Sequence, residues 1–122
     1  MAWFTHGKTV SPTVEEARAL WDDEAPVPRR DAGVMRLVDA FRVPGQPPVF
    51  TGWVESGTLR NGQSVLIRGN AGFARGTIGS IAKGQEMPAE VSARAYVSIK
   101  VHNINRRLEI LGLDRDCTIT GI

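Results

Sequence analysis

Residues 49–65 decide the fold, and they read VFTGWVESGTLRNGQSV. Gly52 permits a close bend or a close backbone approach within a barrel strand, whereas Gly57 and Gly62 serve tight turns. Leu59 and the final valine fill the core between these turns. The stretch therefore predicts two short barrel strands, at 49–55 and 64–68, joined through tight turns.

Short β segments are expected along the chain from residue 34 onward, at 36–43, 49–55, 64–68, 75–81, 93–101 and 117–122. The clearest is 93–101, where apolar residues alternate with polar ones at the period of a half-buried strand. Turn dipeptides separate the segments: Pro44-Gly45, Asn61-Gly62, Gly69-Asn70 and Lys83-Gly84. Such a chain forms a sandwich or a barrel. We expect an all-β fold, a small closed antiparallel β-barrel of about six strands, because closure leaves no strand edge exposed.

The first 33 residues have a different pattern. Pro12 suits the first turn of a helix, and Thr13 with Glu16 forms a capping box. A short amphipathic helix is therefore expected at about residues 12–23, followed by a linker. Its apolar stripe consists of Val14, Ala17, Leu20 and Trp21. We expect an N-terminal extension at 1–33 and a barrel at 34–122, with the stripe docked on the barrel or on a partner, because so short a helix is marginal alone.

A longer pattern extends the deciding stretch toward the N-terminus. Residues 38–45 read VDAFRVPG, so an acidic residue, a phenylalanine and a Pro-Gly turn precede the motif T-G-x-V-x-x-G-x-L-x-x-G-x-x-V. This pattern resembles the second domain of elongation factor Tu and of related translational GTPases. The match covers residues 37–68 without a gap and continues more weakly to residue 104. The resemblance implies a six-stranded β-barrel of the translation-protein kind, here free-standing.

In elongation factor Tu the aminoacyl end of tRNA rests against this domain. Asp39, Phe41 and Thr51 match family positions near that end. For Asp39 and Phe41 we weigh a binding role against a strand-end cap and a barrel-core ring. The family's glutamate, arginine and asparagine are replaced by Val38, Gln46 and Tyr96. These departures remove partners that an α-amino group needs, and so disfavour recognition of the aminoacyl group in the family's manner.

The N-terminus does not carry a nucleotide site. The run Thr5-His6-Gly7-Lys8-Thr9 is similar to the end of a phosphate loop, but the first glycine position of such a loop is Ala2. The residues between Lys8 and the barrel are too few for a nucleotide-binding domain. We therefore predict neither binding nor hydrolysis of GTP.

Charge divides the chain unevenly. Residues 1–33 carry four basic and six acidic side chains, a net charge of −2, and residues 34–122 carry eleven basic and seven acidic ones, a net charge of +4. This excess of basic side chains is compatible with an anionic partner such as RNA, but it is mild, and by itself it favours a plain solvated surface of mixed charge. The candidates for RNA contact, which combine cations with aromatic rings, are Arg94, Tyr96, Lys100, His102, Arg106 and Arg107.

Catalytic and metal chemistry find no support in the sequence. The two histidines, His6 and His102, lie far apart, and Cys117 is the only cysteine, which excludes an intrachain disulfide and paired-cysteine zinc sites. We interpret Cys117 as a small core residue in the last strand, and His102 as a surface or strand-end residue. No cofactor is expected. No membrane-length apolar run and no signal peptide stand out, so we expect a cytoplasmic protein.

The sequence thus predicts a non-catalytic binding module that contacts tRNA or ribosomal RNA. The alternative is a protein-interaction module that engages or mimics a translation factor. Trp3 and Trp21, in the N-terminal extension, are the candidate interface residues for a protein partner. The alternative for both tryptophans is a purely structural role, in which they dock the extension onto the barrel.

Overall fold

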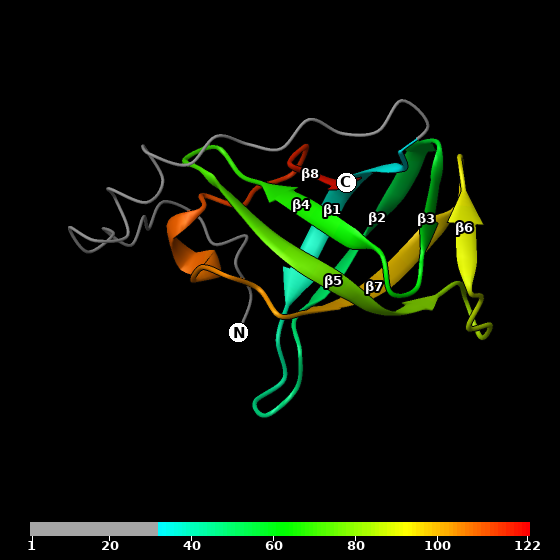
Figure 1. Ribbon diagram of the computed structural model, residues 1–122, viewed down its shortest axis with the longest axis horizontal. Helices are drawn as coiled ribbons and strands as arrows, with labels where there is room; N and C mark the ends of the chain where they lie inside the picture. The colour runs from blue at the N-terminus through cyan, green and yellow to red at the C-terminus, as the bar shows by residue number, and fades with distance from the viewer. Residues whose placement is uncertain (1–31) are drawn as a thin grey trace.

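The computed structural model describes residues 32–122, which form a closed barrel of six antiparallel strands (Figure 1). The barrel strands are β1 (Val34–Phe41), β2 (Val49–Ser56), β4 (Ser64–Arg68), β5 (Phe73–Ala82), β7 (Tyr96–His102) and β8 (Thr118–Gly121). Around the barrel they follow the order β1-β2-β7-β5-β4-β8, and β8 pairs back with β1. The expected closed antiparallel barrel is confirmed, and each of its six strands overlaps one of the predicted segments.

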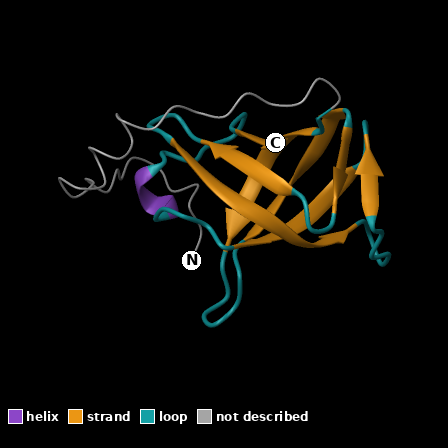
Figure 2. Cartoon of the chain, viewed as in Figure 1, coloured by secondary structure: helices purple, strands orange, loops and turns teal. Residues whose placement is uncertain are grey.

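Two short strands and one helical turn complete the described chain (Figure 2). Strands β3 (Thr58–Arg60) and β6 (Glu90–Ser92) form a separate two-stranded sheet, and η1 (Leu108–Ile110) is a single 3₁₀ turn. Leu59 of β3 and Val91 of β6 face each other in this sheet, and both are buried in the barrel core. The small sheet therefore covers one end of the barrel with its two apolar side chains.

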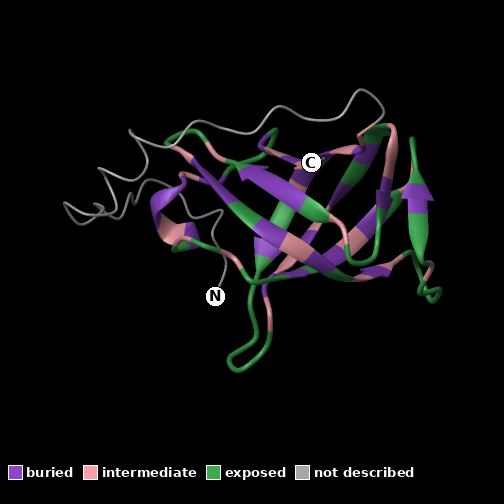
Figure 3. Ribbon diagram, in the orientation of Figure 1, coloured by how far each residue is buried: buried purple, intermediate pink, exposed green. Residues whose placement is uncertain are grey.

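Buried residues alternate with more exposed ones along β1, β2 and β7, whereas β4 has three consecutive buried residues; Figure 3 marks the buried positions on the ribbon. In β7, Val97, Ile99 and Val101 point inward and are buried, whereas Tyr96 and Lys100 are exposed. No charged or polar side chain is buried among residues 32–122. Removal of this apolar surface from water is the main force that closes the barrel.

The largest error in a predicted strand start lies at β7. The segment expected at 93–101 begins as a strand only at Tyr96, and Ala93 is exposed. The amide of Arg94 donates to the Val54 carbonyl at 2.6 Å, and the amide of Val54 donates to the Ala95 carbonyl at 2.8 Å. Arg94 and Ala95 thus lie opposite the single residue Val54, which is a β-bulge. Arg94 has the left-handed backbone conformation typical of the first residue of such a bulge, with a φ of 73°. Arg94 therefore lies in this bulge and not on the strand face.

Gly52 lies where two backbones pass closely, as predicted. It pairs with Leu37 in β1, next to a register shift in that strand. A Cβ atom at position 52 would overlap the carbonyl oxygen of Arg36 and would lie 2.9 Å from its carbonyl carbon. The close passage of β1 and β2 therefore requires glycine at this position.

Gly57 and Gly62 occupy the predicted turns, with φ values of 64° and 79°. Nothing lies within 4 Å of a Cβ atom built on Gly62, so only its backbone conformation disfavours a side chain. Replacing Gly62 by alanine should lower the free energy of unfolding by about 1 kcal/mol. Urea denaturation measures this, and a loss of more than about 3 kcal/mol would show that the site is also sterically closed.

The described chain enters the barrel beside β3. Ala32 forms a parallel bridge with Thr58, and the amide of Gly33 donates to the Thr58 carbonyl at 3.1 Å. The predicted helix at 12–23, Trp3 and Trp21 lie outside the described residues. Within residues 32–122, no helix has the length and apolar character needed to cross a membrane.

Candidate nucleic-acid interface

The outer side of strands β1, β2 and β7 carries a continuous group of apolar and hydroxyl side chains. In the register of the sheet, Phe41 lies opposite Val49, Thr51 opposite Ser98, and Trp53 opposite Tyr96. Directly opposed side chains of neighbouring strands are in contact range, and side chains two residues apart on one strand share a face. We call this group the aromatic face, and it consists of Phe41, Val49, Thr51, Trp53, Tyr96 and Ser98.

Trp53 and Tyr96 form the most exposed part of the aromatic face. Their ring centroids lie 4.9 Å apart with an interplanar angle of 62°, an edge-to-face contact. Trp53 is 50% exposed and Tyr96 42% exposed. Tyr96 was among the residues predicted to contact RNA, whereas Trp53 was not. Its position was indicated by the alternation of β2, because Trp53 lies on the same side as Val49 and Thr51, whereas Phe50, Gly52 and Val54 between them are buried.

The three family-matched residues lie together on this side of the barrel. Asp39 pairs with Thr51 across β1 and β2, and the Thr51 hydroxyl lies 3.3 Å from that of Ser98 on β7. Phe41 is 38% exposed, so the alternative that placed its ring in the barrel core is wrong. The Asp39 carboxylate accepts a hydrogen bond from the Ala40 amide at 2.8 Å, a local backbone contact within β1. Its exposed carboxylate makes the aromatic face acidic at this edge.

Cations border the other edges of the aromatic face. Lys100 and His102 project outward from β7, and Lys100 lies opposite Val49. Arg94 lies in the bulge that immediately precedes Tyr96. Over residues 32–122, no carboxylate lies within ion-pair distance of Arg94 or Lys100.

Arg106 and Arg107 lie beyond the far end of β7, away from the exposed ring pair. Six residue steps separate Tyr96 from His102, a span of about 20 Å. The Arg106 guanidinium stacks over the Phe73 ring at 4.9 Å from its centroid and donates to the Phe73 carbonyl at 2.8 Å. Arg107 directly precedes η1. The six residues predicted to contact RNA thus form two groups. Arg94, Tyr96, Lys100 and His102 lie on β7 and in the bulge before it, whereas Arg106 and Arg107 lie after β7, with Arg106 next to the start of β5.

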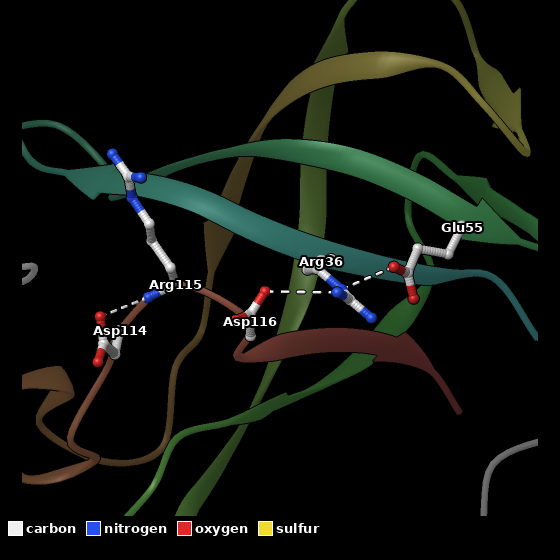
Figure 4. Close-up of polar contacts among 5 residues, drawn as sticks. All are labelled: Arg36, Glu55, Asp114, Arg115 and Asp116. Atoms are coloured by element: carbon white, nitrogen blue, oxygen red, sulfur yellow. Dashed lines mark hydrogen bonds and ion pairs between the residues drawn. The ribbon is translucent and has the colours of Figure 1, made fainter.

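Arg36 connects three segments next to the aromatic face (Figure 4). Its guanidinium lies 2.6 Å from the Glu55 carboxylate on β2 and 3.4 Å from the Asp116 carboxylate that precedes β8. Arg36 is also the β1 partner of Trp53. Because all three charged groups are exposed to a large extent, these ion pairs should contribute little to the stability of the barrel.

The candidate metal ligands of the described residues do not come together. Between Ala32 and Ile122, no cluster of three or more His, Cys, Asp or Glu side chains is arranged to hold a metal ion. Cys117 is buried one residue before β8, so its interpretation as a core residue is confirmed, although it precedes the strand. His102 is exposed at the end of β7, as predicted.

The Cys117 thiol should be unreactive and should make stability fall at alkaline pH. Burial raises its pKa above the ordinary 9.0, and a hydrogen bond from the Asp114 amide at 3.3 Å opposes this only in part. Below pH 9.0 the thiol is protonated in both the folded and unfolded chains; above it, the unfolded thiol ionises first. Urea denaturation from about pH 8 to about pH 10 should show the native chain losing stability relative to Cys117→Ala. Parallel pH curves would contradict the assignment.

No protein-family model matches the chain, and no curated protein matches its sequence.

Proposed function

We propose that this protein is a non-catalytic RNA-binding module that contacts tRNA or ribosomal RNA through the aromatic face. The observation that carries the proposal is the exposed pair of Trp53 and Tyr96, with Arg94 in the bulge next to Tyr96 and Lys100 at the other end of the aromatic face. Neither Arg94 nor Lys100 has a carboxylate partner within residues 32–122.

Exposed rings and cations supply the two interactions that RNA recognition needs. An unpaired base can stack on an exposed aromatic ring whatever the RNA sequence is, because every base has an aromatic face. Arginine and lysine bind the phosphates on either side of that base and release their counterions. The hydroxyls of Thr51 and Ser98 lie between the ring pair and Lys100, where they can bond to a base edge or a ribose hydroxyl.

The choice of translation RNAs rests on the resemblance of residues 37–68 to the second domain of elongation factor Tu. Tyr96 stands at the position of the asparagine that helps to hold the α-amino group in that family. We therefore assign Tyr96 to stacking and not to recognition of an aminoacyl group. The proposed place of action is the cytoplasm, where these RNAs function.

A protein partner is the second candidate, and one observation favours it. The aromatic face has a centre of rings and hydroxyls with charged groups at its edge, which is also the composition of a protein interface. Binding of this kind depends on desolvated aromatic residues and responds weakly to salt. Salt dependence therefore separates the two candidates.

The proposal is tested by titrating the 122-residue chain with total tRNA and with ribosomal RNA at several salt concentrations. We expect saturable binding at low salt and a linear fall of log affinity with log salt. Absence of binding to both RNAs at the lowest salt concentration would reject the RNA proposal and leave the protein partner.

A further inference from the structure

The outer side of strands β7, β5 and β4 carries cations and no carboxylate of its own. We propose that Lys100, His102, Arg75 and Arg68 form a basic track, which binds the phosphate backbone of the RNA strand whose unpaired base stacks on the exposed ring pair. This inference rests on the proposed function and deepens it, because it assigns the strand a path across the barrel.

The charged side chains of the described chain are distributed unevenly over its strands. Strands β7, β5 and β4 are consecutive neighbours in the closed sheet. Together they contain Arg68, Arg75 and Lys100, and their sequences include no aspartate or glutamate. The seven carboxylates of residues 34–122 belong to other elements and connections: Asp39, Glu55, Glu86, Glu90, Glu109, Asp114 and Asp116. These three strands therefore form a connected strip of one sign of charge.

The cations of the strip lie on a diagonal line. His102 of β7 lies opposite Thr77 of β5, and Arg75 is two residues from Thr77 on the same exposed side of β5. Arg75 lies opposite Leu66 of β4, and Arg68 is two residues further along β4. Both steps run in the same direction because β5 is antiparallel to both of its neighbours. Each step is about 7 to 8 Å long, the usual distance between diagonal neighbours in a sheet.

The basic track begins where the aromatic face ends. Lys100 lies opposite Val49 of the aromatic face and is two residues, or about 7 Å, from His102 on the outer side of β7. The His102 imidazole lies against the backbone of Gly79, where a Cβ atom would be 2.8 Å from the ring carbon Cδ2. The line from the ring pair to Arg68 is therefore about 35 Å long, which suits an extended strand and not a single phosphate.

The cations of the track have no anionic partner in the described part of the chain. Arg68, Arg75 and Lys100 are exposed, and none of them forms an ion pair within residues 32–122. A polyanion that binds to a row of like charges removes their mutual repulsion and releases its own counterions. Contacts of this kind position a strand without reading its sequence.

Arg106 lies at the far end of the track. Its guanidinium donates to the Phe73 carbonyl at 2.8 Å, and Phe73 is the β5 partner of Arg68. The basic track therefore connects the two groups of residues that were predicted to contact RNA and that the fold separates along β7.

The experiment titrates the whole chain with labelled uridine oligonucleotides of about 4 and about 16 nucleotides, the two ends of the range of site sizes in small nucleic-acid-binding barrels. In the double variant Arg68→Gln with Arg75→Gln, the slope of log affinity against log salt for the longer strand should fall by about 1.4, or about 0.7 for each lost contact. Its affinity should fall by about 25-fold at about 0.1 M salt. The affinity for the shorter strand should stay unchanged, because Arg75 lies more than about 20 Å from the ring pair, beyond the Debye length of about 10 Å.

The matched control is Arg60→Gln with Arg115→Gln, which removes the same charge from β3 and from the segment before β8. It should keep the affinity for both oligonucleotides, and urea denaturation verifies that both double variants are folded. An unchanged slope for Arg68→Gln with Arg75→Gln, an equal loss in the control, or an equal loss for the shorter strand would each overturn the basic track and leave the proposed function standing. Absence of binding by the native chain to these strands and to tRNA would overturn both.

Discussion

Alanine at Trp53 should weaken the binding of tRNA by about 5- to 150-fold, because stacking of one base on an aromatic side chain contributes about 1 to 3 kcal/mol. Half of the Trp53 surface is exposed, and its ring contacts only the edge of Tyr96 among the aromatic rings of residues 32–122. Tyr96→Ala should have an effect of similar size. Binding is measured by fluorescence anisotropy of labelled tRNA at constant salt.

Met87→Ala is the matched control for these variants. Met87 is 65% exposed and lies between β5 and β6, outside the aromatic face. Its replacement removes a comparable exposed apolar side chain and should leave the RNA affinity unchanged. Equal losses for Met87→Ala and Trp53→Ala would contradict a role for the aromatic face.

Gly52→Ala should destabilise the barrel by about 3 kcal/mol, the upper part of the usual range for overpacking. The new methyl group would overlap the Arg36 carbonyl oxygen in the neighbouring strand, and a backbone atom of a closed barrel cannot move aside as a flexible side chain does. Gly52→Val should lower stability further. The measurement is the free energy of unfolding from urea titration.

Gly62→Ala gives the comparison that isolates the cause. Both variants add one methyl group, but the Cβ position at Gly62 is open, and its φ of 79° accounts for the whole cost. Gly52 has no such backbone requirement, so its larger effect would come from overlap alone. A smaller loss of stability for Gly52→Ala than for Gly62→Ala would show that β1 and β2 can separate without cost.

The barrel was predictable because each of its six strands is long enough to show alternation or is bounded by turn residues. The deciding stretch, residues 49–65, contains β2 and the start of β4, with Gly57 and Gly62 at the turns between them. Strands β3 and β6 were missed because three residues cannot establish a period of two. The burial of Leu59 was nevertheless foreseen from its place between the two turn glycines.

The bulge at Arg94 could not be predicted for a different reason. The alternation of residues 93–101 continues through the bulge in the sequence, whereas the extra residue appears only when the register with Val54 is known. Arg94 in the left-handed conformation also departs from the glycine that usually marks such a position. Pairing between strands distant in sequence thus decided where the strand begins.

The candidate site was foreseen in part. Tyr96, Lys100 and His102 share the outer face of β7, as their spacing indicates. Trp53 lies beside these residues because β2 pairs with β7, which the sequence alone does not indicate. Arg106 lies apart from them because it packs on Phe73. Which strand pairs with which is a property of the closed barrel that alternation in a single segment does not contain.

The central claim is that RNA binds to the aromatic face through its bordering cations, and the salt dependence of binding tests it most directly. The 122-residue chain and its double variant Arg94→Gln with Lys100→Gln are titrated with tRNA over a series of salt concentrations. The account predicts weaker binding by the variant and a slope of log affinity against log salt that is smaller by roughly 0.7 for each lost phosphate contact, or about 1.4 for two. An unchanged slope, or no binding by the native chain at low salt, would contradict it.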